Sequence, residues 1–252
     1  MPTTSPEDLQ ATLTRPSSGG DFHVAAGVVK RADLRRHPQE DPPRPFLRGW
    51  FHLGAFLVSL PAGILVVAGA TSTRARVAAV VYAVAVTTLF AVSSTYHLRV
   101  WTPAGRRRMR RLDHGTIYVM IAGCYTPLCL LALRGPISGG LLVAVWAGAA
   151  IGVGFAITGL AERRYFGLAC YVTMGWLLVI ALPGLTHQLT PAHVALLMAG
   201  GLAYTVGAAV LGLNRPNPFP LTFGYHEIWH VLVIVACACH YVTIYSVVHA
   251  GT

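Results

Sequence analysis

Long apolar runs alternate with short polar breaks along this chain from residue 49 onward. Most of the runs reach the roughly 20 residues that a helix needs to cross the hydrocarbon core of a bilayer. None shows strict alternation of apolar and polar residues, which favours helices over the strands of a β-barrel. The pattern predicts an all-α bundle of seven transmembrane helices, at residues 49–70, 77–98, 115–133, 137–160, 166–185, 193–213 and 225–248.

The composition agrees with a membrane protein. Of the 252 residues, 54% are hydrophobic and only 11% are charged, whereas about a quarter of a soluble domain is charged. We therefore expect a multi-pass protein of the plasma (bacterial inner) membrane. Residues 1–48 are polar, rich in proline, serine and charge, and contain no apolar signal-peptide core. They predict a disordered cytoplasmic tail before a transmembrane domain at residues 49–250.

The positive charges predict the orientation of the bundle. Of the 19 arginine and lysine residues, 16 lie in the tail or in the segments that follow the second, fourth and sixth spans. The positive-inside rule then places the N-terminus in the cytoplasm and the C-terminus outside. We expect the arginine run at residues 106–111 to lie in a loop and to contact anionic lipid head groups. Nucleic-acid binding is disfavoured, because no aromatic platform accompanies the charges.

Ionisable side chains inside membrane spans are costly and usually mark function. In the predicted orientation, the end of the second span and the starts of the third and seventh lie in one leaflet. His226 and His230 are four residues apart, on one helix face. Three imidazoles with an open fourth position are typical of catalytic zinc, and a nearby carboxylate could hold the reactive water. The candidate metal ligands are His97, His226 and His230, and the candidate catalytic residues are Asp113 and Ser93.

Each of these residues also has a simpler interpretation. Asp113 alone is typical of a cap on the third span, and His97 alone could be an interfacial histidine. His226, Glu227 and His230 also match the H-E-x-x-H motif of zinc proteases, in which the glutamate is the general base. No acidic residue follows Glu227 to supply the usual third ligand. The motif therefore supports zinc more than it supports proteolysis.

Three further histidines need separate predictions. His52 lies at the start of the first span and could support the metal site from behind the ligands. His114 is expected to point away from the face that carries Asp113. His240 lies deep in the seventh span, about 15 Å from His230 at 1.5 Å per residue, and is expected to make a hydrogen bond between helices.

Over about residues 45–250 the chain resembles the hemolysin III-related family, the bacterial branch of the progestin and adipoQ receptor superfamily. The resembling pieces are residues 93–97 (SSTYH), 113–114 (DH) with 121–127 (IAGCYTP), and 223–230 (FGYHEIWH). The resemblance implies an intracellular N-terminus and zinc held by His97, His226 and His230. It also implies that Asp113 acts through the zinc-bound water, with Ser93 nearby. Bacterial relatives often begin the first span with glutamate and asparagine ahead of Thr-His, whereas residues 48–52 here read RGWFH.

The resemblance implies three possible functions. The superfamily includes receptors with ceramidase-like activity, and its wider relatives include alkaline ceramidases. The first hypothesis is therefore a zinc-dependent hydrolase that cleaves an amide or ester in a membrane lipid, such as a sphingolipid or a fatty-acyl compound that enters between helices. The second is a non-enzymatic sensor or regulator of membrane state, in which zinc ties the second and seventh spans together. The third, a cytolysin, is disfavoured because seven apolar helices with a cytoplasmic polar site resemble a resident membrane protein.

Overall fold

The computed structural model describes residues 22–24, 27–29, 45–163 and 165–250. The chain divides into two compact units, Met1–Pro43 and Arg44–Thr252. In the first unit, strands β1 (Phe22–Val24) and β2 (Gly27–Val29) pair in antiparallel fashion. The predicted disorder of residues 1–48 falls largely outside the described residues and stays a prediction.

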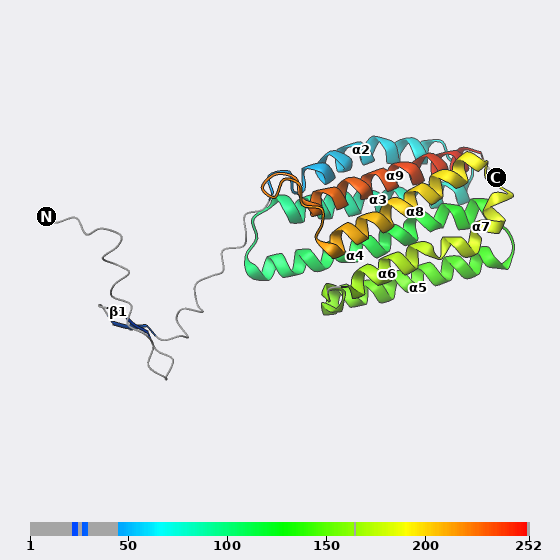
Figure 1. Ribbon diagram of the computed structural model, residues 1–252. Coiled ribbons are helices and arrows are strands. Elements are labelled where there is room, and N and C mark those ends of the chain that lie inside the picture. Colours follow the sequence, from blue (N-terminus) through cyan, green and yellow to red (C-terminus); the bar gives the residue numbers. More distant parts are fainter. Residues whose placement is uncertain (1–21, 25–26, 30–44, 164, 251–252) are drawn as a thin grey trace. The chain divides into compact units, whose positions relative to one another are not determined.

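The second unit is a bundle of seven helical spans, as predicted (Figure 1). Five spans are single helices, while the third and the fifth are each built from two helical pieces. The spans are α2 (Trp50–Ala68), α3 (Thr73–Leu98), α4 (Pro103–Pro127) continued by the π-helical turn η1 (Leu128–Ala132), α5 (Pro136–Thr158), α6 (Phe166–Trp176) with α7 (Leu178–Thr186), α8 (Pro191–Leu213) and α9 (Tyr225–His249). A short 3-10 turn, η2 (Leu160–Glu162), links α5 to α6.

The third span begins twelve residues earlier than the hydropathy predicts. Its first helical residue is Pro103, and the Thr102 hydroxyl accepts a hydrogen bond from the backbone N–H of Gly105. Threonine as cap followed by proline is a common start for a helix. The arginines at 106–111 therefore lie on the first turns of α4 and not in a loop, because arginine is a good helix former. Asp113 lies ten residues inside α4, so the interpretation of this residue as a cap is wrong.

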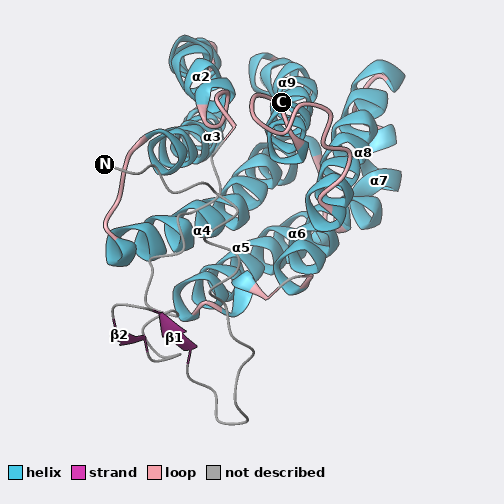
Figure 2. Ribbon diagram, turned by 60° about the vertical axis from the view of Figure 1, so that its left-hand side comes forward, coloured by secondary structure: helices cyan, strands magenta, loops and turns pink. Residues whose placement is uncertain are grey.

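Helix α4 forms the centre of the bundle. It packs against α3, α5, α6 and α9, and α9 also packs against α2, α3 and α8 (Figure 2). In the most apolar stretch of the third span 78% of residues are buried, against 17% in the first. Helices α8 and α9 approach closely where Gly207 faces Trp229, since a Cβ atom on Gly207 would lie 2.6 Å from the indole ring. Close backbone contact of this kind is how small residues hold membrane helices together.

The fifth span is interrupted at Leu177, between α6 and α7. A break in lipid must find partners for the backbone groups that it frees. The hydroxyl of Tyr125, on α4, lies 3.1 Å from the carbonyl oxygen of Met174 and 2.6 Å from that of Gly175, and donates to them. The central helix thus stabilises the interruption directly.

Candidate metal centre

Three histidines from two helices meet at one end of the bundle. His97 lies in the last turn of α3, and His226 and His230 lie in the first turns of α9. Their ligand nitrogens all lie within 4.8 Å of one another. The Nε2 atoms of His97 and His226 are 3.3 Å apart. These side chains are therefore close enough to bind one metal ion, as the spacing in the sequence predicts.

The ring orientations suit a shared ion. The His97 ring is inclined at 73° to that of His226 and at 61° to that of His230, and the latter two are inclined at 68°. Rings set at steep angles can direct their in-plane lone pairs toward one point. Zinc–nitrogen bonds of about 2.0–2.1 Å in a tetrahedral site put two ligand nitrogens roughly 3.4 Å apart. The separation of His97 and His226 already matches this value.

The start of α2 lies in close contact with His97, the candidate metal ligand on α3. Gly49, just before α2, has a left-handed backbone with φ of 89°. A Cβ atom on this glycine would lie 2.8 Å from the Cβ of His97 and 3.0 Å from Cγ of Leu98. Only glycine combines this backbone conformation with so little space. The residue therefore lets α2 begin directly against His97.

Both carboxylate oxygens of Glu227 accept hydrogen bonds that hold neighbouring segments together. Its Oε1 accepts a hydrogen bond of 2.7 Å from Nε of Arg48, and its Oε2 accepts one of 2.8 Å from the backbone N–H of Gly224. The side chain is completely buried. Glu227 thus caps α9 and ties it to the segment before α2, where Phe46 also donates a backbone hydrogen bond to Leu221. This arrangement is not that of the general base in an H-E-x-x-H protease.

Asp113 and Ser93 lie in the wall of an interior cavity that His226 and His230 also line. The two side chains, from α4 and α3, form a hydrogen bond with each other. The cavity measures about 300 Å³ and continues between α4, α6, α7, α8 and α9 as far as His240 and Ile244. From residue 226 to residue 244 the helix rises about 27 Å, which is most of the hydrocarbon thickness. Beyond its polar end, the cavity wall is mainly apolar.

Three other histidines line the same cavity, in ways that the sequence only partly predicts. His52, 3% exposed, stacks on His230 with ring centroids 3.8 Å apart and planes inclined by 15°. His114 lines the same cavity as Asp113, which its expected position away from the face of Asp113 did not indicate. Consecutive residues of a helix point about 100° apart, so the cavity extends far enough around α4 to be lined by both. His240 makes the expected contact between helices, with Nε2 3.3 Å from the carbonyl oxygen of Leu197.

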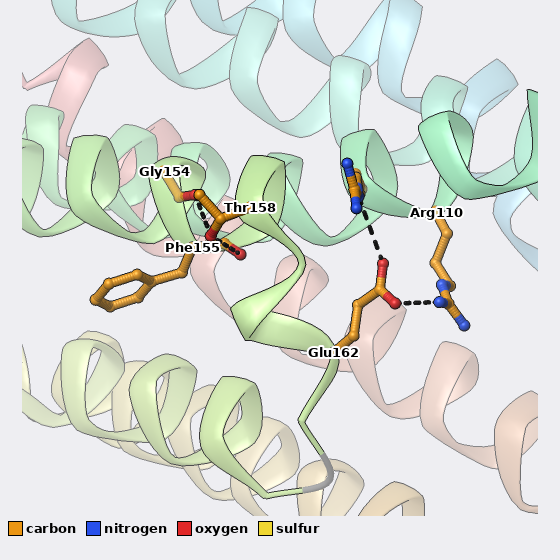
Figure 3. Close-up of polar contacts among 6 residues, drawn as sticks. Arg110, Gly154, Phe155, Thr158 and Glu162 are labelled. Atoms are coloured by element: carbon orange, nitrogen blue, oxygen red, sulfur yellow. Dashed lines mark hydrogen bonds and ion pairs between the residues drawn. The ribbon is translucent and has the colours of Figure 1, made fainter. Parts of the chain in front are cut away.

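The rim of the cavity carries a cluster of charges. Glu162 and Arg163, next to the end of α5, line it. Figure 3 shows Glu162 reaching Arg110 of α4, with which it forms an ion pair; Nε of Arg111 lies 3.8 Å from the other carboxylate oxygen. The ion pairs join η2 to the arginine-bearing turns of α4. They hold Glu162, which lines the cavity, against the first turns of α4.

Comparison with known proteins agrees with these observations. A profile of the family described as "Haemolysin-III related" matches residues 41–241. The chain is 37% identical to "Hemolysin-3" of Bacillus cereus over 185 residues, which cover 72% of this chain and 81% of the relative. It is 38% identical to the "Hemolysin-3 homolog" of Bacillus subtilis over 123 residues, covering 49% and 55% of the two chains.

A more distant similarity extends to animals. The chain is 28% identical to the human "Monocyte to macrophage differentiation factor" over 177 residues, covering 68% of this chain and 70% of the relative. This similarity supports the wider superfamily, and the seven apolar helices confirm the predicted multi-pass location in the bacterial inner membrane. The chain therefore belongs to the haemolysin-III-related family, the bacterial branch of the progestin and adipoQ receptor superfamily.

Proposed function

We propose that this protein is a zinc-dependent hydrolase that cleaves an amide or ester bond in a membrane lipid. The supporting observation is that two of the three converging imidazoles, those of His226 and His230, line an apolar interior cavity together with the carboxyl group of Asp113 and the hydroxyl group of Ser93. A structural zinc site normally has four protein ligands and needs no cavity beside it. Three nitrogen ligands beside a cavity are instead the pattern of a catalytic site.

The roles of the residues follow from their positions. His97, His226 and His230 would hold the ion, and zinc there would acidify a bound water and polarise a carbonyl group. Asp113 accepts the proton that the attacking water loses, while its hydrogen bond with Ser93 keeps the carboxylate oriented. As the amide or ester bond breaks, Asp113 passes that proton to the departing amine or alcohol. The products are a carboxylic acid and the amine or alcohol to which it was joined.

The cavity supports a substrate with a long apolar chain. Its volume of about 300 Å³ lies within the range of ligand pockets in proteins. Its wall includes the apolar side chains Ile117, Leu128 and Val233, which are suited to hydrocarbon. A fatty-acyl chain or a sphingolipid would place its carbonyl group near Asp113 and its tail toward Ile244.

We expect a lipid to enter the cavity laterally from the bilayer, between the fifth span and α8. Val179 lines the cavity and is also 46% exposed on the lipid-facing surface. In the other half of the fifth span, Nε1 of Trp176, the last residue of α6, donates a hydrogen bond of 2.9 Å to the hydroxyl of Thr205 on α8. This side-chain bond joins α6 to α8, and its rupture would widen the route without disturbing the metal ligands.

Metal content and lipid turnover test the proposal together. We would purify the wild type without chelators, beside His97→Ala, His226→Ala and His230→Ala. His187→Ala is the matched control, because His187 is an exposed residue at the end of α7. We expect about one zinc per chain in the wild type and the control, and almost none in the three variants. The zinc-loaded protein would then release fatty acid from one class of reconstituted lipid.

Two results would point elsewhere. Wild-type protein without metal would exclude the hydrolase. A full zinc complement without turnover on amide or ester lipids would favour the sensor or regulator, with zinc as a tie between α3 and α9. The names of the Bacillus relatives suggest lysis of blood cells. Release of dye from liposomes by the purified protein would favour that function.

A further inference from the structure

His52 is a buried polar side chain of the cavity wall that is neither a candidate metal ligand nor a candidate catalytic group, and both of its ring nitrogens are buried without a partner among the described residues. It projects from the first turn of α2, is 3% exposed and lines the same cavity. One edge of its ring lies near the backbone of His230. Within the described residues, however, neither ring nitrogen has a hydrogen-bond partner of normal geometry. An unsatisfied buried polar atom costs about 1–3 kcal/mol, so such groups call for a functional explanation.

The stacking geometry excludes His52 as a further ligand of the same ion. Its ring lies parallel to that of His230, within 15°, at 3.8 Å. A histidine binds zinc through a lone pair in the plane of its ring, at about 2.0–2.1 Å. An ion between two parallel rings would lie half of their spacing out of both planes. The other three rings meet at 61–73°, so they converge where His52 cannot.

The ring nitrogens of His52 are therefore available to form hydrogen bonds with a ligand in the cavity. A neutral imidazole offers one N–H donor and one acceptor. Of the polar groups at this end of the cavity, Ser93 is hydrogen-bonded to Asp113, and a carboxylate can only accept. His52 is the side chain next to the ligand cluster with a donor left over. Its apolar neighbour Phe90 packs against the His52 ring in an edge-to-face arrangement, with ring centroids 5.2 Å apart and planes inclined at 67°.

We infer that His52 is a substrate-binding residue, whose ring N–H donates a hydrogen bond to the carbonyl oxygen of the lipid held at the metal centre. The inference rests on the proposed function and adds a residue to it. In a site that excludes water, a preorganised donor to the oxygen on which negative charge develops strengthens both binding and reaction. The stacked His230 fixes the direction of this donor.

Octanoyl hydroxamate tests the inference without a known substrate. Its hydroxamate group binds zinc or cobalt and presents a carbonyl oxygen, and its chain fits an apolar cavity. Cobalt(II) replaces zinc and reports the coordination of the metal through its visible absorption. The variants are His52→Phe, which keeps a stacking ring without nitrogen, and His52→Gln, which restores a donor. His114→Phe is the control, because His114 also lines the cavity and has a buried ring nitrogen without a partner among the described residues.

We expect His52→Phe to bind one metal with an unchanged cobalt spectrum, and to bind the hydroxamate about tenfold more weakly, the loss of one hydrogen bond. His52→Gln should recover part of that loss, and His114→Phe should bind within about twofold of the wild type. Unchanged hydroxamate affinity in His52→Phe overturns the inference, as does loss of metal. If the wild type itself binds neither metal nor hydroxamate, the proposed function fails as well, so the two failures are distinguishable.

Discussion

Replacement of Gly49 by alanine tests whether the start of α2 positions the ligand His97. Gly49 has a φ of 89°, a conformation that costs an alanine about 1–2 kcal/mol. The added Cβ would lie 2.8 Å from Cβ of His97, closer than carbon atoms normally approach, so α2 or the end of α3 must move. We expect Gly49→Ala to lower the free energy of unfolding by about 2 kcal/mol. Displacement of His97 should weaken zinc binding about tenfold, which corresponds to about 1.4 kcal/mol.

Competition with a fluorescent chelator measures the zinc affinity, and thermal unfolding in detergent measures the stability. Gly54→Ala is the matched control, because Gly54 lies on the same helix and its Cβ would meet no atom within 4 Å. This control should keep the wild-type zinc affinity and should be as stable as the wild type or up to about 1 kcal/mol more stable. Wild-type zinc affinity in Gly49→Ala would refute the reasoning. So would an equal loss in Gly54→Ala, since it would show that any change in α2 suffices.

Three further substitutions have distinct expected outcomes. Asp113→Asn should keep the metal, as measured by elemental analysis, but lower lipid turnover by about 10²–10⁴-fold, the usual contribution of a general base; turnover near the wild-type rate would remove Asp113 from the mechanism. Glu227→Gln should lower stability by about 3 kcal/mol in thermal unfolding, because the half-buried Arg48 loses its charged partner, while the turnover of folded, metal-loaded protein stays within about threefold. A loss of turnover as large as that of Asp113→Asn would instead restore the protease-like role for Glu227. Tyr125→Phe should lower stability by about 1–2 kcal/mol, since two backbone carbonyls at the break between α6 and α7 lose their donor; unchanged thermal unfolding would show that these carbonyls find other partners.

The sequence predicts the spans well because hydropathy over about 20 residues is a strong local signal. It misplaces the start of α4, since the arginines at 106–111 lower the hydropathy of turns that are still helical. The Thr102-Pro103 pair is the signal that could have found this start. The break at Leu177 has no such marker, because it depends on Tyr125 from another helix to stabilise it.

The candidate site shows the same division between local and tertiary information. The spacing of His226 and His230 is local, and the topology brings His97 to the same end of the bundle, so the cluster is predictable. The stacking of His52 on His230 and the ion pair of Glu227 with Arg48 depend on how α2 packs against α9. No pattern within one helix determines such contacts. The H-E-x-x-H motif illustrates this limit, since the structural role of its glutamate, Glu227, depends on Arg48, which lies 179 residues away in the sequence.

The extension of α4 into the arginine run fixes the distance along the helix between these arginines and Asp113. Arg110 and Arg111 lie within one turn of Asp113 on a continuous helix, about 3–5 Å along its axis. We expect these arginines to contact the phosphate layer of the lipids, so that the continuous helix would set the distance between that layer and the carboxylate. A thicker or thinner bilayer would then be accommodated by tilt or deformation at the opposite end, where Arg74 and Arg76 lie in the first turn of α3 and Arg134 lies between η1 and α5. The reacting group of a lipid would meet Asp113 at the same distance below its own head group in membranes of different thickness.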